Sequence, residues 1–349
     1  MTTFRTPFEA PKRVWALMGP HRGDNNQVLA LAEALGLPFE TKPLRYNQWR
    51  RLRPRLLGAT LGSLTPRSRA MIGGDPPDLT ISTGHRSVPV VQAIRRRSGG
   101  RTRCVHVGYP RLSPAHFDLV VATPEYPVPD HPNVLRVPFA LTREKQAALC
   151  APDAAWLENF PPPRRLLAIG GPTRHWSLDE RIVLDAVAEL LRAAKRDGGS
   201  VLAVGSPRTP EAALRAVRQA VTEARTPAML VPSNGPPSYP ELLAAADSIF
   251  VTADSVAMVA DAVMTGKPVG LVPIRATRLG RAYMALMDRL RPGERVHPRD
   301  LRFFWAELDK HDLAGTLERP RPGAVPDLTA NVARRVRRLL DEPELPAHN

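Results

Sequence analysis

The sequence predicts an α/β protein with two domains, each built around a doubly wound, Rossmann-like parallel sheet. Three observations point to this class. Short runs rich in β-branched and aliphatic residues alternate with amphipathic helical stretches along the whole chain. The chain has 349 residues, which is enough for two domains of ordinary size with separate cores. A proline triplet, Pro161–Pro163, interrupts the alternation near the middle and is typical of a stiff linker.

The individual elements follow from the spacing of the apolar residues. Strands are expected at residues 13–18, 79–82, 104–107, 119–122, 134–137, 165–169, 200–204, 229–231, 249–252 and 269–272. Helices are expected between them, among them residues 26–36, 88–97 and 178–194, with a last helix at 328–340. We therefore expect a first domain over residues 1–160, a second over 164–325 and a C-terminal helical segment over 326–349.

Residues 248–273 carry the most informative pattern. A short β-branched strand is followed by Asp254 and Ser255, both of which are common at helix N-caps. An apolar stripe at helical spacing comes next, then Gly266 and Pro268 as stop signals before a second buried strand. A helix that begins just past a strand's carboxyl end offers free backbone N–H groups to an anion. A purely structural βαβ unit with a capped helix explains the same residues.

The composition is that of a globular protein with a strong basic bias. Hydrophobic residues make up 43% and charged residues 24%, and the formal net charge is +15. Such a charge favours phosphate-rich partners. No DNA-binding motif or aromatic platform accompanies the arginine clusters, so we expect an anionic membrane surface rather than nucleic acid. The two cysteines, Cys104 and Cys150, have neither metal-ligand spacing nor a disulfide pattern.

Two loops of the first domain hold candidate catalytic residues. His21, Gly23 and Asp24 follow the first strand, where Asp24 is either a general base or, with Asn25, an ordinary helix N-cap. His85 follows the strand at 79–82, and a surface His-Arg pair is the alternative there. The carboxyl ends of parallel strands form the usual ligand edge of a doubly wound sheet.

The second domain has a matching set of polar loops. Gly170, Gly171, Thr173 and Arg174 follow its first strand, and Ser206 follows the next. Backbone N–H groups, a hydroxyl and a guanidinium suit a diphosphate. Together with Asp254 and Ser255 they predict a site for an anion. The sequence contains no Asp-x-Asp motif, and we expect no metal and no cofactor.

The order of these residues resembles GT-B glycosyltransferases, most clearly the N-acetylglucosaminyltransferase of peptidoglycan synthesis. The resemblance implies that the helix after Asp254 meets the donor's phosphates. It also implies that Asp261, five positions before Gly266, holds the ribose hydroxyls. The resemblance also places Asp24 where that enzyme has a histidine beside the reacting centre. His21 is the alternative candidate for the catalytic base. The last helix would return to the first domain, and the two domains would face each other across a cleft.

The chain also resembles, over nearly its whole length, the plant mitochondrial-fission Elm family and its bacterial relatives, which are described as glycosyltransferases. Gly23, the Gly84–Arg86 triplet, Gly170–Gly171 and the Asp254–Ser255 unit carry this likeness. The function it implies is transfer of a sugar from a nucleotide-diphosphate sugar to a lipid-linked or cell-envelope saccharide. Two alternatives remain open: a non-catalytic membrane-associated adaptor and a nucleotide-sugar epimerase.

The expected location is the cytoplasm, peripheral at the inner membrane. Residues 1–13 lack the apolar core of a signal peptide, and no apolar run reaches the length of a membrane span. Residues 50–69 interleave arginines with leucines, which suits contact with anionic lipid. An ordinary, partly buried helix is the alternative interpretation of that segment.

Overall fold

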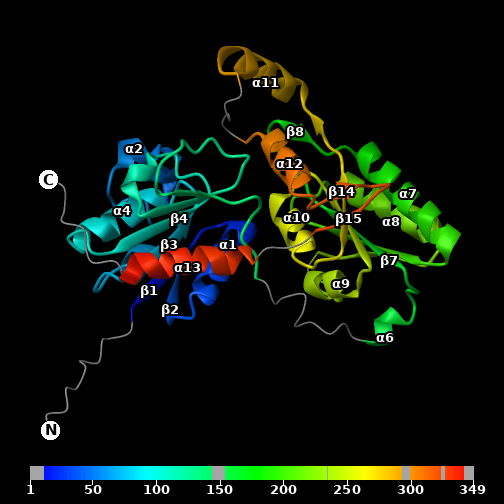
Figure 1. Cartoon of the computed structure of the whole chain (residues 1–349), viewed down its shortest axis with the longest axis horizontal. Helices are drawn as coiled ribbons and strands as arrows, with labels where there is room; N and C mark the ends of the chain where they lie inside the picture. Colours follow the sequence, from blue (N-terminus) through cyan, green and yellow to red (C-terminus); the bar gives the residue numbers. More distant parts are fainter. Residues whose placement is uncertain (1–11, 144–153, 234, 293–298, 324–326, 342–349) are drawn as a thin grey trace, which may run out of the picture. The chain divides into compact units, whose positions relative to one another are not determined.

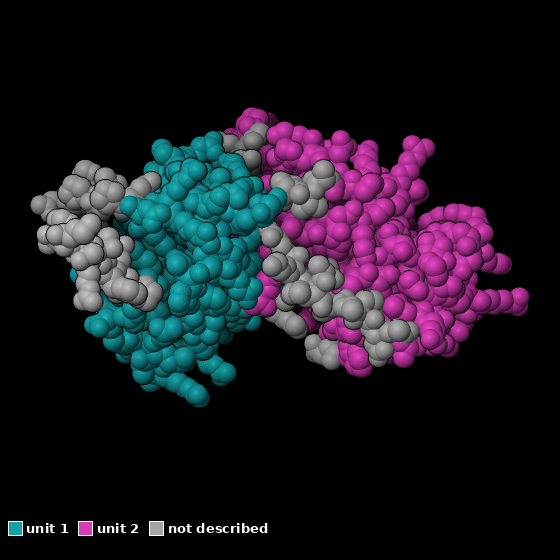
Figure 2. Space-filling view, turned by 60° about the horizontal axis from the view of Figure 1, so that its bottom comes forward, with its two compact units in different colours: residues 1–122, 128–136, 327–349 teal, residues 123–127, 137–326 magenta. Residues whose placement is uncertain are grey.

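The computed structural model describes residues 12–143, 154–233, 235–292, 299–323 and 327–341, which form two compact units (Figures 1 and 2). Unit 1 comprises residues 1–122, 128–136 and 327–349, and unit 2 comprises residues 123–127 and 137–326. The chain therefore passes between the units several times, first after Ala122. Pro161–Pro163 lies inside unit 2, just before its first strand, and Cys150 lies outside the described residues.

Unit 1 is a six-stranded parallel sheet with helices packed on it. Its strand order is β2-β1-β3-β4-β5-β6. The strands are β1 (Val14–Met18), β2 (Phe39–Pro43), β3 (Leu79–Thr83), β4 (Arg103–Val107), β5 (Leu119–Ala122) and β6 (Val134–Arg136). The α-helices are α1 (Arg22–Ala34), α2 (Pro54–Leu57), α3 (Pro66–Met71), α4 (Val88–Arg97) and α13 (Leu328–Asp341), with 3-10 turns η1 (Gln48–Arg51) and η2 (Pro114–His116).

Unit 2 repeats this plan with a sheet in the order β10-β9-β7-β11-β12-β14 and β15 antiparallel to β12. Its strands are β7 (Arg164–Ile169), β9 (Ser200–Gly205), β10 (Ala228–Val231), β11 (Ser248–Thr252), β12 (Pro268–Val272), β14 (Gly315–Thr316) and β15 (Arg321–Pro322), and β8 (Trp176–Ser177) pairs with β13 (Arg275–Ala276). Its helices are α6 (Ala154–Leu157), α7 (Glu180–Asp197), α8 (Glu211–Glu223), α9 (Tyr239–Ala245), α10 (Val256–Val263), α11 (Arg278–Leu290) and α12 (Leu301–Lys310).

The predicted fold class, two Rossmann-like parallel sheets, is confirmed. Strands β3, β5 and β9 are buried at every position, as their continuous apolar runs indicate. Strand β2 was not predicted, because Phe39–Pro43 is a half-exposed edge strand without an apolar run. Helix α1 begins four residues before the expected start, at Arg22. Asp24 thus lies in its first turn rather than at the N-cap, where an acid suits the positive end of the helix dipole.

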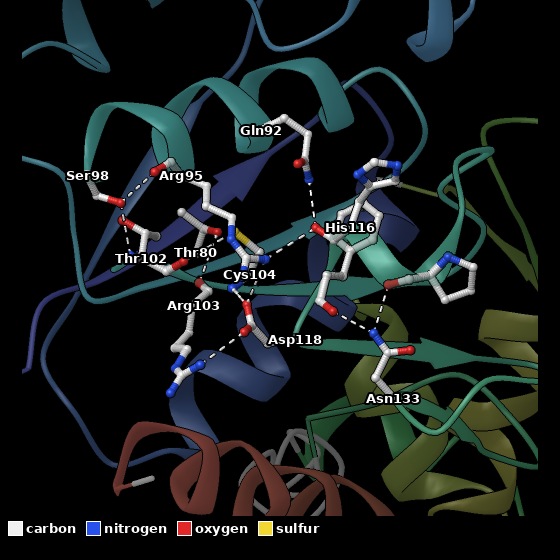
Figure 3. A network of polar contacts seen from close by, with 12 residues as sticks. Thr80, Gln92, Arg95, Ser98, Thr102, Arg103, Cys104, His116, Asp118 and Asn133 are labelled. Atoms are coloured by element: carbon white, nitrogen blue, oxygen red, sulfur yellow. Dashed lines mark hydrogen bonds and ion pairs between the residues drawn. The ribbon is translucent and has the colours of Figure 1, made fainter. Parts of the chain in front are cut away.

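A half-buried carboxylate, that of Asp118, joins a helix and the sheet in unit 1 (Figure 3). Asp118 accepts a hydrogen bond from the backbone N–H of Cys104 at 2.7 Å. Its two oxygens also pair with Arg95 of α4 and Arg103 of β4, both at 3.3 Å. Burial raises the pKa of the Cys104 thiol to about 12, so this cysteine is an inert core residue.

Candidate functional site

Three loops of unit 2 meet at the carboxyl edge of adjacent strands. Strand β7 lies between β9 and β11, so the residues that follow these three strands are neighbours. The loops begin at Gly170, Ser206 and Ala253. Parallel doubly wound sheets bind their ligands at this edge. The structure thus brings Gly170, Gly171, Ser206, Asp254 and Ser255 to one edge of the sheet.

Gly170 and Gly171 are needed for close approach between these loops. A Cβ on Gly170 would lie 2.3 Å from an oxygen of Asp254, and one on Gly171 would lie 2.2 Å from the carbonyl oxygen of Arg208. The N–H of Gly170 donates to Thr252 Oγ1 at 2.7 Å, and that of Gly171 donates to Asp254 Oδ2 at 2.8 Å. The two amides that the sequence analysis assigned to phosphate therefore have partners within the protein.

Asp254 is the buried centre of this arrangement. Only 1% of it is exposed, and its Oδ2 also lies 3.4 Å from a guanidinium nitrogen of Arg208. Its Oδ1 is buried and has no hydrogen-bond partner among the described residues. Burial raises the pKa of Asp254, whereas the hydrogen bond from Gly171 opposes that rise. Asp254 therefore holds the Gly170–Gly171 loop and keeps Arg208 beside it.

The loop after β9 is fixed by Thr209 rather than by Ser206. The Thr209 hydroxyl lies 2.8 and 2.6 Å from the carbonyl oxygens of Ile169 and Gly170, which share its single proton, and it accepts from the N–H of Ser206 at 2.7 Å. Ser206 Oγ accepts from the N–H of Arg208 at 3.3 Å. These bonds place the Arg208 guanidinium over Gly171, whose carbonyl oxygen it contacts at 3.4 Å.

The N-terminus of helix α10 lies at the same edge of the sheet. Ser255 is its N-cap, and the Ser255 hydroxyl makes no capping hydrogen bond. The first N–H groups of a helix have no partner inside the helix, so those at 256–258 face this edge of the sheet. The helix end at Ser255 and the Arg208 guanidinium beside Asp254 both bring positive charge to this edge of the sheet.

Asp261 lies further along α10 and is only partly exposed. Burial raises its pKa to about 7. Tyr239, at the start of α9, has a buried hydroxyl with no hydrogen-bond partner in the described part of the chain. Burial and then the nearby Asp261 carboxylate raise the pKa of Tyr239. The Asp261 carboxyl group of α10 and the Tyr239 phenol of α9 are therefore close enough to influence each other's charge.

The remainder of the loop after β7 turns toward α11. The N–H of Thr173 donates to the carbonyl oxygen of Trp176 at 2.8 Å, which closes the loop. Arg174 is exposed, while His175 is buried with its ring 4.8 Å from that of Tyr283. Burial lowers the pKa of His175, and the neighbouring Arg174 lowers it further, so the imidazole is neutral at pH 7.

The candidate catalytic residues of unit 1 lie at the carboxyl ends of the adjacent strands β1 and β3. His21 is the exposed N-cap of α1, and Asp24 is half-buried in the first turn. The Asn25 side chain fixes this loop through two hydrogen bonds with the backbone of Gly19, at 2.7 and 2.9 Å. His85 is half-buried beside Gly84, whose φ of +71° suits glycine.

A buried histidine beside His85, His106, was not predicted from the sequence. His106 Nδ1 lies 2.9 Å from Ser82 Oγ, and its Nε2 is buried without a hydrogen-bond partner among the described residues. Burial and the charge of His85 lower the pKa of His106 to about 3, so its ring is neutral. No pattern in the sequence of β4 indicated a functional histidine, because a histidine inside a continuous buried strand occupies a core position.

Comparison with known proteins places the chain in a family. The sequence matches the family described as "Mitochondrial fission ELM1" over residues 22–340. The chain belongs to the mitochondrial fission ELM1 family. The "Mitochondrial fission protein ELM1" of Arabidopsis thaliana is 25% identical over 245 residues, which cover 62% of this chain and 56% of that protein. The match therefore spans only about half the length of this curated relative.

Solved structures share the fold of this ELM1-family chain. The Staphylococcus aureus MnaA–UDP co-structure is 12% identical with a TM-score of 0.52, and the match covers 95% of this chain and 97% of that one. The UDP-GlcNAc 2-epimerase of Methanocaldococcus jannaschii is 11% identical with a TM-score of 0.52, over 93% of this chain and 99% of that one. At these identities the likeness shows the fold alone.

The ELM1-family chain also has a buried acid in unit 2 that the sequence analysis did not single out. Glu125 is 1% exposed, and its Oε2 has no hydrogen-bond partner among the described residues. Arg299 lies 3.5 Å from its other oxygen, yet burial raises the pKa of Glu125. Within the described part of the chain, no group of three His, Cys, Asp or Glu side chains is placed to hold a metal ion.

Proposed function

We propose that this chain transfers a sugar from a nucleotide-diphosphate sugar to a lipid-linked or cell-envelope saccharide. The observation that carries the proposal is the set of groups around the N-terminus of α10. The free N–H groups after Ser255 and the acid Asp261 belong to α10, and the Arg208 guanidinium reaches Asp254 from the neighbouring loop after β9, at the ligand edge of a Rossmann-like sheet. A nucleoside diphosphate needs this combination: positive charge for its phosphates and an acceptor for its ribose hydroxyls.

The proposed roles follow from the chemistry of the leaving group. The acceptor hydroxyl attacks the anomeric carbon of the sugar, and the nucleoside diphosphate leaves with the electrons of the broken C–O bond. The end of α10 and Arg208 stabilise the negative charge that develops on it. Asp261 accepts hydrogen bonds from the ribose hydroxyls. Thr173 and Arg174 of the loop after β7 and Ser206 of the loop after β9 are proposed to flank the phosphates. Asp254 holds Gly170 and Gly171 in place.

A residue of unit 1 is proposed to take the proton of the acceptor hydroxyl. Asp24 takes it as the bond forms, and His21 or His85 orients the acceptor. An alcohol is too weak a nucleophile without such a base. Asp24 is half-buried and fixed on α1, which favours a defined position for its carboxyl group.

A lipid-linked acceptor agrees with the surface of residues 48–57 in unit 1. Trp49 and Leu56 are 54% and 74% exposed, and the chain between them carries Arg50, Arg51, Arg53 and Arg55. None of these four arginines forms an ion pair with a described residue. Exposed apolar side chains interleaved with arginines suit an anionic membrane surface. In the described part of the chain, no helix is long and apolar enough to cross a bilayer.

The direct test is turnover of labelled nucleotide sugars with and without a lipid-linked saccharide. Release of nucleoside diphosphate that depends on the acceptor is the expected result. A changed sugar on an intact donor, without acceptor, would instead indicate the epimerase. Binding of donor with neither reaction would indicate a non-catalytic adaptor.

A further inference from the structure

Helix α11 carries an exposed apolar ridge of three leucines. Leu279, Leu286 and Leu290 are 57%, 52% and 63% exposed. They are spaced by seven and four residues, so they lie in one line along the helix. In Figure 1, α11 is drawn at the top, above β8 and α12, with its outer side uncovered. Large aliphatic side chains grouped in this way mark an interaction surface.

The helix is attached to unit 2 along a different side. Of its residues, only Gly280 and Met284 are buried. A Cβ on Gly280 would lie 2.3 Å from the carbonyl oxygen of His175, so the helix backbone packs tightly against the loop that follows Gly170 and Gly171. The N–H of Thr277, the α11 N-cap, donates to the same carbonyl oxygen at 2.9 Å. The N-terminal turn of α11 is therefore attached to the loop that follows Gly170 and Gly171, and the leucine ridge lies on a side of the helix that this contact leaves free.

The charges next to the ridge are positive. Arg278 and Arg289 are exposed and form no ion pair with any described residue. Asp288 is the one acid in α11, and both of its oxygens bond Arg302 of α12, at 2.7 and 2.9 Å. Leucines on one side and unpaired arginines on the next are the pattern of a helix that lies in the interface of an anionic bilayer.

We propose that α11 binds anionic lipid, with the leucine ridge in the headgroup–acyl boundary and Arg278 and Arg289 at the lipid phosphates. This adds a membrane contact in unit 2 to the one proposed for residues 48–57 of unit 1. The lipid contact itself stands on the surface of α11, whereas its use in presenting a lipid-linked acceptor rests on the proposed function. A second copy of the chain is the competing occupant of the ridge.

The test is sedimentation of the full chain with vesicles of phosphatidylcholine alone and of phosphatidylcholine with about one-third phosphatidylglycerol. Binding is expected only to the anionic vesicles, and it should weaken at high salt. Leu286→Ser combined with Leu290→Ser should lower the partition coefficient about tenfold or more, because two apolar side chains no longer enter the bilayer. The surface of residues 48–57 could hide the loss by binding the vesicles itself. The two leucine substitutions are therefore repeated in a chain that also carries Trp49→Ser and Leu56→Ser.

The charge contribution has a matched control on α8. Arg278→Gln with Arg289→Gln should weaken binding about tenfold and reduce its salt dependence. Arg215→Gln with Arg218→Gln removes the same charge from exposed positions of unit 2 and should change binding less than threefold. Thermal unfolding of each variant checks that the fold is retained.

Three results would overturn the proposal. They are failure of the chain to bind anionic vesicles at low salt, unchanged binding of the leucine variants in both backgrounds, and self-association that the leucine variants abolish without any vesicle binding. The last result would assign the ridge to a contact between copies. Nucleotide affinity is measured without vesicles, so a failed lipid contact and a failed nucleotide site are separate outcomes.

Discussion

At the residue scale, the protonation state of the Asp261 carboxyl group affects stability and, in the proposed site, the binding of a nucleotide. Burial raises its pKa to about 7, whereas an aspartate in the unfolded chain titrates near about 4. Between these values the folded protein holds the proton more tightly than the unfolded chain. This residue's contribution to stability is therefore greatest below about pH 4 and falls as the pH rises through about 7.

Replacement of Asp261 by Asn removes that titration. Asp261→Asn should become more stable than the wild type as the pH rises from about 4 to about 7, by up to about 4 kcal/mol, and the difference should level off above pH 7. Urea unfolding at a series of pH values measures it. Parallel curves for the two proteins would show that Asp261 does not titrate in this range. Since the carboxylate is the proposed ribose acceptor, nucleotide affinity should also rise with pH in the wild type only.

Asp24 is the residue on which the proposed chemistry depends. Asp24→Asn should reduce turnover by roughly 10²–10⁴ with donor affinity nearly unchanged, because only the base is lost. Its place in the first turn of α1 gives it a second role, since an acid there stabilises the helix by about 0.3–1 kcal/mol. Activity per folded molecule separates the two roles. A variant that is slightly less stable but fully active would reduce Asp24 to a helix-stabilising residue.

At the element scale, α13 closes unit 1 by packing on α1 from the far end of the sequence. Arg337 donates through Nε to the carbonyl oxygen of Leu35 at 2.9 Å and also reaches that of Ala34, so a guanidinium caps the C-terminus of α1. Cations stabilise this end of a helix. A contact between residues about 300 positions apart makes the last helix part of the first unit.

Loss of this cap should be measurable. Arg337→Ala should lower the free energy of unfolding by about 1–3 kcal/mol, because two carbonyl groups lose a charged donor. Arg338→Ala is the matched control on the same helix, since Arg338 is exposed and its side chain makes no hydrogen bond with a described residue. Chemical unfolding of the two variants is the measurement. Equal losses would show that the Arg337 hydrogen bonds contribute nothing beyond helix propensity.

The elements also show what a sequence alone can predict. Continuous apolar runs predict buried parallel strands such as β9 and β11, and the glycines at 170 and 171 predict a tight loop. The partners in that loop were not predictable. Arg208 reaches Asp254 only because Thr209 ties its loop to Ile169, and no local pattern encodes a contact between residues 46 positions apart. His106 was missed for the same reason, since its character depends on Ser82 and His85.

At the scale of the whole molecule, the net charge of +15 has a distribution that fits two kinds of anion. Arginines of residues 48–57 and of α11 stand next to exposed apolar side chains, which suits a lipid surface. Arg208, by contrast, is held by hydrogen bonds at the end of a helix, which suits a bound phosphate group. The membership in the ELM1 family and the Rossmann-like fold are compatible with both uses of this charge.

The most direct test of the nucleotide site is calorimetric titration of the full chain with uridine and guanosine diphosphates in the absence of lipid. The wild type should bind at least one of them. Ser255→Tyr and Arg208→Gln should each weaken that binding by about 1–3 kcal/mol, through a blocked helix end and a lost guanidinium. Arg215→Gln, an exposed arginine on the neighbouring helix α8, should bind like the wild type. Binding that is absent in the wild type, or equally tight in all variants of unchanged thermal stability, would contradict a nucleotide site at α10.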